Sequence, residues 1–260
     1  MNLTISLAQI HILLGRPQEN LAQGKSLIEE AARGGSQLIL LPELWTTGYD
    51  LSNAHNLSQE NRALLPEIAR LSNECSIAIG GSLMLEQEGK IYNTFLLYSP
   101  GNNDPAAYQK IHLFRLMQED LWLTPGDHLQ TVQAAWGQAG LAICYDLRFP
   151  EMFRRYSLEG ASLLLLSAEW PLRRIAHWQT LLRARSIENQ CFVAAVNCVG
   201  EIGGETFGGS SAIFSPWGET LVEGNSNQPG LLTATLDMAQ VEKIRQTIPV
   251  FKDRRVDLYG

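Results

Sequence analysis

Residues 37–43 of this 260-residue chain read Gln-Leu-Ile-Leu-Leu-Pro-Glu, an apolar run that ends in a proline and a glutamate. A short run of this kind is typical of a strand buried in a sheet. Toward the N-terminus, residues 19–33 are amphipathic and residues 3–10 form another apolar run. Pro17 favours a helix start before the amphipathic stretch, and the glycines at 34–35 favour its end. The sequence therefore predicts a β-α-β unit.

The same alternation of short apolar runs and longer amphipathic stretches continues to the C-terminus, which predicts an α/β fold packed in layers. We expect strands at residues 3–10, 37–41, 77–85, 91–98, 140–144, 162–166, 192–197, 211–215 and 231–236. We expect helices at residues 19–33, 59–75, 152–159 and 175–189. Residues 99–106 and 201–209 are rich in loop-forming residues and are expected to border a pocket. No linker divides the chain, so we expect one domain over residues 1–260.

Composition excludes several classes of function. No apolar run approaches the roughly 18 to 20 residues of a membrane span and no basic leader is present, so we expect a cytoplasmic protein with no membrane contact. The 4 cysteines are too few and too scattered for a disulfide framework or a zinc site, and no nucleotide-binding fingerprint occurs. We therefore expect neither a metal nor a cofactor. The net charge of -7, with dispersed basic residues, argues against a nucleic-acid partner.

Three reactive side chains stand at the ends of predicted elements. Glu43 follows the strand at 37–41, and Cys144 ends the strand at 140–144, directly before a polar turn whose N–H groups would face an oxyanion. Lys110 lies between them in a mixed apolar and aromatic stretch. Each residue also has an ordinary interpretation: a glutamate that caps a turn or pairs with an arginine, a small buried cysteine, and a solvated surface lysine.

The segments around these residues match the motifs of a known family, in its order. The motifs are Pro-Glu-x-x-x-x-Gly-Tyr at 42–49, Tyr-x-Lys-x-His-Leu-Phe at 108–114 and Cys-Tyr-Asp-Leu-Arg-Phe-Pro-Glu at 144–151. The chain resembles the nitrilase-like carbon–nitrogen hydrolases over essentially its whole length. The resemblance implies a four-layer α-β-β-α sandwich and a catalytic triad of Glu43, Lys110 and Cys144. It also implies a second glutamate, at Glu119, which is otherwise interpreted as an exposed helix residue.

The chemistry of these residue types agrees with that triad. An ordinary cysteine has a pKa of about 8.5, and a cation such as Lys110 favours its reactive thiolate form. In the implied mechanism Cys144 attacks the amide carbonyl, while Glu43 acts as general base, protonates the departing ammonia and then activates the water that hydrolyses the thioester. Lys110 and the backbone N–H of Tyr145 would hold the oxyanion, and one such donor is typically worth about 3 kcal/mol of barrier.

The segment Ser167–Pro171, followed by two arginines, resembles the omega-amidase branch of the family. Members of this branch hydrolyse the terminal amide of short dicarboxylic monoamides to acid and ammonia. Arg173 or Arg174 would bind the distal carboxylate bidentately, and Trp170 would form an apolar wall of the pocket. Alternatively, both arginines are solvated at a helix start.

Other functions use the same residues. An N-carbamoyl amidase, a deaminated-glutathione amidase and a nitrilase would share the triad, so the triad alone does not select the substrate. A papain-like dyad of Cys144 with His112 or His177 and a non-catalytic metabolite-binding protein are further alternatives. Arg148 and Glu151 are expected to pair around the nucleophile turn. The resemblance also suggests a homodimer or larger assembly, in which the C-terminal segment reaches a neighbouring subunit.

Overall fold

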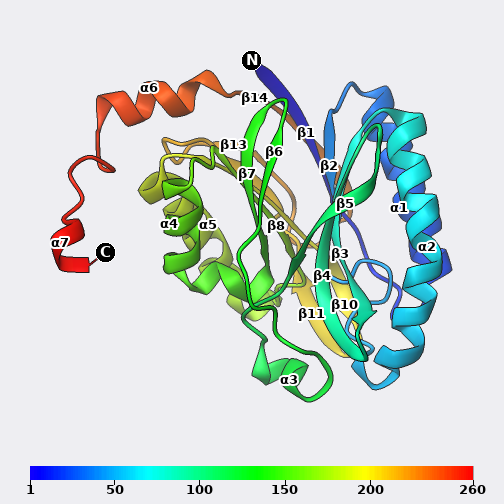
Figure 1. Cartoon of the computed structure of the whole chain (residues 1–260). Coiled ribbons are helices and arrows are strands. Elements are labelled where there is room, and N and C mark those ends of the chain that lie inside the picture. The colour runs from blue at the N-terminus through cyan, green and yellow to red at the C-terminus, as the bar shows by residue number, and fades with distance from the viewer. Residues whose placement is uncertain (260) are drawn as a thin grey trace.

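Four layers make up the computed structural model, which describes residues 1–259 (Figure 1). Helices α1 (Pro17–Arg33) and α2 (Ala54–Cys75) cover one six-stranded sheet, and α4 (Pro150–Leu158) and α5 (Ile175–Asn189) cover a second one. The two sheets pack face to face between the helical layers. The expected α/β class and the α-β-β-α sandwich are therefore confirmed.

The first sheet has the strand order β14-β1-β2-β3-β4-β5. Its strands are β14 (Gly230–Asp237), β1 (Asn2–Gln9), β2 (Leu38–Leu40), β3 (Ala78–Gln87), β4 (Lys90–Ser99) and β5 (Asn102–Gln109). Strands β1, β2 and β3 are parallel, with Ile5 opposite Leu38 and Leu38 opposite Ala78. Helices α1 and α2 form the crossovers between these parallel strands, since parallel neighbours cannot be joined by a tight turn.

The second sheet has the order β13-β12-β9-β8-β7-β6. Its strands are β13 (Thr220–Glu223), β12 (Ala212–Phe214), β9 (Phe192–Asn197), β8 (Leu163–Ala168), β7 (Gly137–Ile143) and β6 (Thr131–Ala134). Strands β7, β8 and β9 are parallel, and α4 and α5 cross between them. The carboxyl ends of β7 and β8 therefore lie side by side.

The main core lies between the two sheets. Strands β2, β8 and β9 are buried at every position, as continuous apolar runs in parallel sheets require. Leu7 and Leu40 of the first sheet belong to the same buried cluster as Leu141 and Leu165 of the second. Each buried leucine contributes about 1.5 to 3 kcal/mol, so this shared core holds the sheets in one arrangement.

Two predicted loops were wrong. Residues 102–109 form β5, whose Ala107 pairs with Leu96, and residues 199–208 form a hairpin of β10 (Val199–Ile202) and β11 (Glu205–Gly208). Both segments are polar or glycine-rich because they lie at a sheet edge or on the surface, where backbone pairing needs no apolar side chains. Both nevertheless border cavities, as the sequence predicted.

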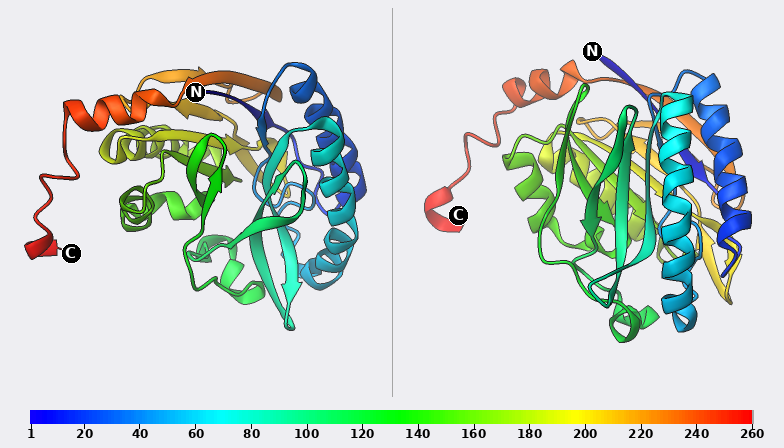
Figure 2. Two further views of the ribbon diagram at one scale, coloured as in Figure 1. Left: turned by 45° about the horizontal axis from the view of Figure 1, so that its top comes forward. Right: turned by 45° about the vertical axis from the view of Figure 1, so that its right-hand side comes forward.

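The first and the last strand of the chain pair at one edge of the first sheet. Strand β14 is antiparallel to β1, with Asn2 opposite Asp237 and Gln9 opposite Gly230. After β14 the chain continues through α6 (Ala239–Thr247) to α7 (Val256–Tyr259), and Figure 2 shows this segment extending away from the body of the molecule. Among the described residues, no helix is long and apolar enough to cross a membrane.

Candidate active site

The ends of two buried strands bring Glu43 and Cys144 to one place. Glu43 comes shortly after β2, and Cys144 comes directly after β7 and begins a 3-10 turn that ends at Arg148. Cys144 has a φ of 43°, in the left-handed region that side chains other than glycine rarely adopt. Such a conformation costs of order 1 to 3 kcal/mol and is concentrated at functional sites. Leu44, directly after Glu43, has a φ of 42°.

Lys110 lies between two carboxylates in the interior. Its Nζ is 2.7 Å from Oε1 of Glu43 and 2.5 Å from Oε1 of Glu119, and all three side chains are fully buried. Burial alone would lower the pKa of Lys110, but Glu119 and Glu43 outweigh that effect and raise it. The lysine therefore carries a permanent positive charge.

Glu119 is the first residue of α3 (Glu119–Trp122) but is not an exposed helix residue. Its Oε2 accepts a hydrogen bond from the backbone N–H of Phe114 at 2.9 Å, and its Oε1 also accepts one from the hydroxyl of Tyr49. Burial raises the pKa of Glu119, Lys110 lowers it and Glu43 raises it, with a net increase. Glu119 and Tyr49 thus fix the position of the lysine.

The carboxylate of Glu43 is held from three directions. Besides Lys110, Oε1 accepts a hydrogen bond from Nδ2 of Asn93 at 2.7 Å, and Oε2 accepts one from the backbone N–H of Glu169 at 3.0 Å. No sequence motif marks Asn93, because it lies inside β4 and reaches Glu43 only through the pairing of strands in the first sheet. These bonds orient the carboxylate beside the thiol.

The thiol of Cys144 does not have the lowered pKa that a neighbouring lysine suggests. Burial raises its pKa well above the ordinary value and the negative charge of Glu43 adds to the increase, while Lys110 lowers it by less. A hydrogen bond to Glu43 also favours the protonated thiol. The resting nucleophile is therefore a thiol, so the reaction requires a base to take its proton.

Asp146 holds the turn that carries the nucleophile. Its carboxylate accepts hydrogen bonds from the backbone N–H of Ile143 at 2.9 Å and from the hydroxyl of Tyr108 at 2.8 Å. Nδ1 of His112 lies 2.8 Å from the same carboxylate, and the His112 ring stacks on Phe149 at 3.6 Å. His112 therefore supports the turn rather than the sulfur, which leaves the papain-like dyad of Cys144 with His112 no geometric basis.

Arg148 does not pair with Glu151, so that prediction was wrong. Its guanidinium lies over the ring of Trp170 at 4.8 Å and is 3.4 Å from Nδ1 of His177. Glu151 is exposed in the first turn of α4, where an acidic side chain interacts favourably with the helix dipole. Arg148 and Trp170 instead form part of a cavity wall.

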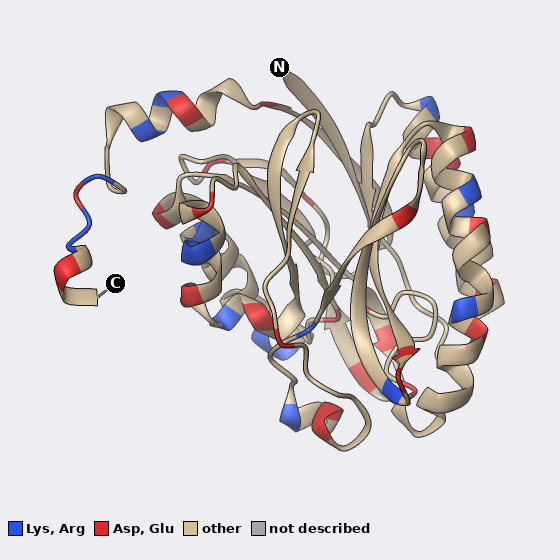
Figure 3. Ribbon diagram, viewed as in Figure 1, with Lys and Arg blue, Asp and Glu red and all other residues tan. Residues whose placement is uncertain are grey.

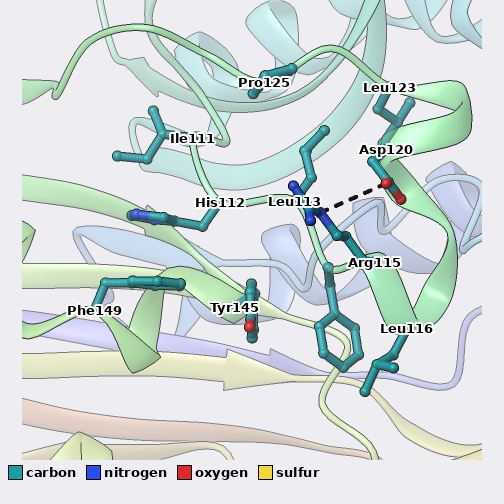
Figure 4. Close-up of a pocket in the computed structure, with 11 residues that line it drawn as sticks. Ile111, His112, Leu113, Arg115, Leu116, Asp120, Leu123, Pro125, Tyr145 and Phe149 are labelled. Atoms are coloured by element: carbon teal, nitrogen blue, oxygen red, sulfur yellow. Dashed lines mark ion pairs between the residues drawn. The ribbon is translucent and has the colours of Figure 1, made fainter.

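A small cavity opens beside the nucleophile. Its volume is about 10 Å³, room for about one water molecule. The lining residues are Phe114, Cys144, Tyr145, Arg148, Glu169, Trp170, Pro171 and Arg174. Phe114 and Tyr145 also line a neighbouring cavity of about 510 Å³, whose surroundings are shown in Figure 4. The two cavities are therefore neighbours that share Phe114 and Tyr145 as lining residues.

The structure separates the two arginines that the sequence could not distinguish. Arg173 is exposed and forms an ion pair with Glu205 at 2.5 Å. Arg174 lines the cavity of Cys144, and its Nη1 is buried without a hydrogen-bond partner among the described residues. Its guanidinium lies 5.5 Å from the ring of Phe114. Arg174 is therefore the one placed to meet an anion beside the nucleophile.

The remaining cysteines do not take part in the site. Cys75, Cys191 and Cys198 are free, and Cys198 is fully buried with a thiol pKa raised by that burial. Among residues 1–259, no group of three or more His, Cys, Asp or Glu side chains is arranged to hold a metal ion.

Comparison with known proteins agrees with this geometry. The sequence model of the carbon–nitrogen hydrolase family matches residues 4–246. The chain is 40% identical over 261 residues to the 2-oxoglutaramate amidase of Bacillus subtilis, with all of both chains covered. A carbon–nitrogen hydrolase superfamily structure from Xanthomonas campestris, with an arsenic adduct in its active site, matches with a TM-score of 0.92 and 33% identity over 98% of this chain and 97% of that one.

A further solved structure bears on the chemistry. A variant of the amidase from Nesterenkonia sp. AN1 carries the acetamide moiety of fluoroacetamide covalently bound at its active-site cysteine. It matches with a TM-score of 0.88 and 29% identity over 99% of this chain and 95% of that one. The chain described here belongs to the carbon–nitrogen hydrolase family, as its three motifs indicated. Within that family it is a thiol-dependent amidase.

Proposed function

We propose that this amidase hydrolyses the terminal amide of a short dicarboxylic monoamide, with 2-oxoglutaramate as the representative substrate, to the acid and ammonia. One observation carries the proposal: Arg174 lines the cavity of Cys144, and its guanidinium has a buried nitrogen with no hydrogen-bond partner among the described residues. A carboxylate is the natural partner for such a group. The likeness to the 2-oxoglutaramate amidase of Bacillus subtilis supports the same substrate class.

The buried groups define the order of proton transfers. As Sγ of Cys144 attacks the amide carbon, Glu43 takes the thiol proton, because the thiol is protonated at rest. The positive charge of Lys110 and the backbone N–H of Tyr145 stabilise the oxyanion. Glu43 then gives its proton to the leaving nitrogen, which departs as ammonia. A water molecule, deprotonated by Glu43, hydrolyses the thioester and restores the thiol.

Arg174 is the proposed carboxylate ligand and Trp170 the apolar wall, whereas Arg173 is engaged with Glu205. Because the cavity holds only about 10 Å³, the substrate enters only if side chains in its wall move. Phe114 and Arg174 are the side chains proposed to move, since the guanidinium of Arg174 lies over the ring of Phe114 and Phe114 lines both this cavity and the larger one. The bound carboxylate would then replace Phe114 as the contact of the guanidinium.

The test is ammonia release from succinamate, 2-oxoglutaramate, N-carbamoyl compounds and simple nitriles. We expect turnover of the dicarboxylic monoamides and its loss in Cys144→Ala. Arg174→Met should raise KM for the monoamides by about 10- to 100-fold, as the loss of a charge-assisted pair predicts, and Arg173→Met should change it by less than about threefold. Faster ammonia release from N-carbamoyl compounds or nitriles than from the dicarboxylic monoamides would reject the monoamides as the substrate class.

We also propose that the protein acts as a homodimer or larger assembly in the cytoplasm. The C-terminal segment extends from the body in Figure 2 and exposes Val256, Leu258 and Tyr259, each more than 60% accessible. Apolar side chains on an extended segment suit contact with a second copy. We expect no nucleic-acid partner, and this proposal is supported by the mixture of acidic and basic residues along the ribbons of α1 and α2 in Figure 3. Sedimentation of the full chain and of residues 1–247, which lack the segment after α6, tests the assembly and the role of that segment. A monomeric full chain would contradict the proposal.

A further inference from the structure

Glu169 is a buried carboxyl group that the proposed mechanism does not use. It follows β8 directly and is 1% exposed. Its backbone is tied to the reacting groups, because its N–H donates to Glu43 and its carbonyl oxygen is 3.7 Å from Sγ of Cys144. Neither side-chain oxygen has a hydrogen-bond partner among the described residues. The backbone of Glu169 is thus held beside the nucleophile, and its buried carboxyl group has no hydrogen-bond partner among the described residues.

A structural role does not account for this side chain. Buried polar groups are normally hydrogen-bonded, and an isolated buried carboxylate is strongly disfavoured. The nearby cation, Lys110, is already engaged by Glu43 and Glu119. Burial, followed by the charge of Glu43, raises the pKa of Glu169 well above its ordinary value. Glu169 is therefore a neutral acid with one O–H donor and one carbonyl acceptor.

The position of Glu169 limits what it can bind. It lines the cavity of Cys144 together with Arg174, and it also lines a separate cavity of about 320 Å³ that includes Tyr49. Arg174 and Glu169 thus line the same small space, and each has buried side-chain atoms without a hydrogen-bond partner among the described residues: Nη1 of Arg174 and both carboxyl oxygens of Glu169. A ligand that fills this space must offer an anion to one group and a hydrogen-bonding atom to the other.

We infer that Glu169 determines specificity by donating a hydrogen bond to the 2-oxo oxygen of the substrate while Arg174 binds its carboxylate. The inference rests on the proposed function, in which the amide carbon is at Cys144 and the carboxylate is at Arg174. The 2-oxo group lies between these two ends of the substrate and is an acceptor. The corresponding 2-amino acid amide, glutamine, carries an ammonium group there, which cannot accept the hydrogen bond from the O–H of Glu169 and would add a second cation beside the guanidinium of Arg174. The site therefore selects 2-oxo acids over 2-amino acids.

Two variants and a matched pair of substrates test this role. The substrates are 2-oxoglutaramate and glutaramate, which has the same length and no 2-oxo group. We expect Glu169→Leu to lower kcat/KM for 2-oxoglutaramate by about 10- to 100-fold, and for glutaramate by less than about threefold. Glu169→Gln keeps a neutral donor and should preserve the wild-type ratio between the substrates within about threefold. For each substrate, kcat/KM of a variant is compared with kcat/KM of the wild type. Any equilibrium between different forms of that substrate in solution is the same in both measurements and does not affect the ratio.

Several results would overturn the inference. An equal loss on both substrates in Glu169→Leu would mean that Glu169 acts on the amide or on the fold. A loss in Glu169→Gln as large as that in Glu169→Leu would mean that an ionised carboxylate is required. If Glu169→Leu does not fold, Glu169→Met and Glu169→Gln give the same comparison. Wild-type protein that hydrolyses no dicarboxylic monoamide would instead reject the proposed function, on which the inference depends.

Discussion

Three glutamates and one lysine surround the thiol, and their partners differ. Glu43 and Glu119 share the positive charge of Lys110, and both accept further hydrogen bonds. Glu169 has neither a cation nor a hydrogen bond for its side chain. The same residue type therefore serves as a base beside the thiol, as a support for the lysine and as a neutral acid in the cavity. The roles differ because the neighbouring cation, the hydrogen bonds and the burial of each carboxyl group determine its protonation state, as in other sites with paired carboxyl groups.

Replacing Glu169 with glutamine should change how stability depends on pH. A carboxyl group whose pKa is raised by folding contributes its full stability below its unfolded pKa, near 4.5, and that contribution is lost as pH rises toward the folded pKa. The loss is at most about 1.4 kcal/mol per pH unit. Because glutamine does not titrate, the Tm of Glu169→Gln minus that of the wild type should increase from pH 5 to pH 8. A difference independent of pH would contradict the neutral state of Glu169.

Glu119→Gln tests the support of the lysine. The substitution removes one of the two negative charges on Lys110, so the ammonium interacts more strongly with Glu43 and makes it a weaker base. We expect kcat to fall by about 10- to 100-fold with KM changed by less than about threefold. The neighbouring Asp120→Asn is the control, because Asp120 forms only a surface ion pair with Arg115 at 3.8 Å. A kcat equal to that of the control would exclude the role.

At the scale of elements, the buried strands and the edge strand β14 were predictable, whereas the edge strand β5 and the surface hairpin were not. Predicted strand 192–197 and predicted helix 175–189 coincide with β9 and α5. The pattern of apolar residues in these two elements reflects their burial, so the elements can be recognised from the sequence alone. Strand β5 and the β10–β11 hairpin escaped prediction, because edge or surface pairing depends on a partner far along the chain. Helix α2 begins at Ala54 rather than residue 59, and Pro66 lies within it.

The packing of β7 against α4 can be tested at Gly140. A Cβ at this position would lie 2.5 Å from Cδ2 of Tyr156, a fully buried side chain whose hydroxyl donates to the carbonyl of Leu141. Gly140→Ala should therefore destabilise the protein by about 1 to 3 kcal/mol and displace the strand that carries Cys144. Calorimetry and ammonia release measure both effects.

Gly230→Ala, in strand β14, provides the control for Gly140→Ala. No atom lies within 4 Å of a Cβ at Gly230, so its effect should stay within about 0.5 kcal/mol. Equal destabilisation by the two substitutions would show that loss of glycine itself, rather than contact with Tyr156, determines the cost.

At the scale of the whole molecule, the sequence predicted the site residues that the family resemblance indicates. It missed the residues that contact them only after the chain has folded. Glu43, Lys110, Cys144 and Glu119 were named from motifs, and the structure places them together. Asn93 lies within a strand of ordinary composition, and its contact with Glu43 exists only once the first sheet has formed. The thiol pKa was predicted in the wrong direction, because burial outweighs the lysine and cannot be read from a motif.

Unfolding of the whole chain tests the proposal that residues 1–260 form one domain. The core between the sheets includes side chains of both sheets, and β14, the last strand, pairs with β1, the first strand. We therefore expect the two sheets to unfold together. Trp45 belongs to the cluster under α1 and α2, whereas Trp178 belongs to the core shared by the sheets. In urea, Trp45→Phe and Trp178→Phe should each show coincident fluorescence and far-UV circular dichroism transitions. Separate transitions that report different sheets would show that the sandwich consists of two independently folding parts.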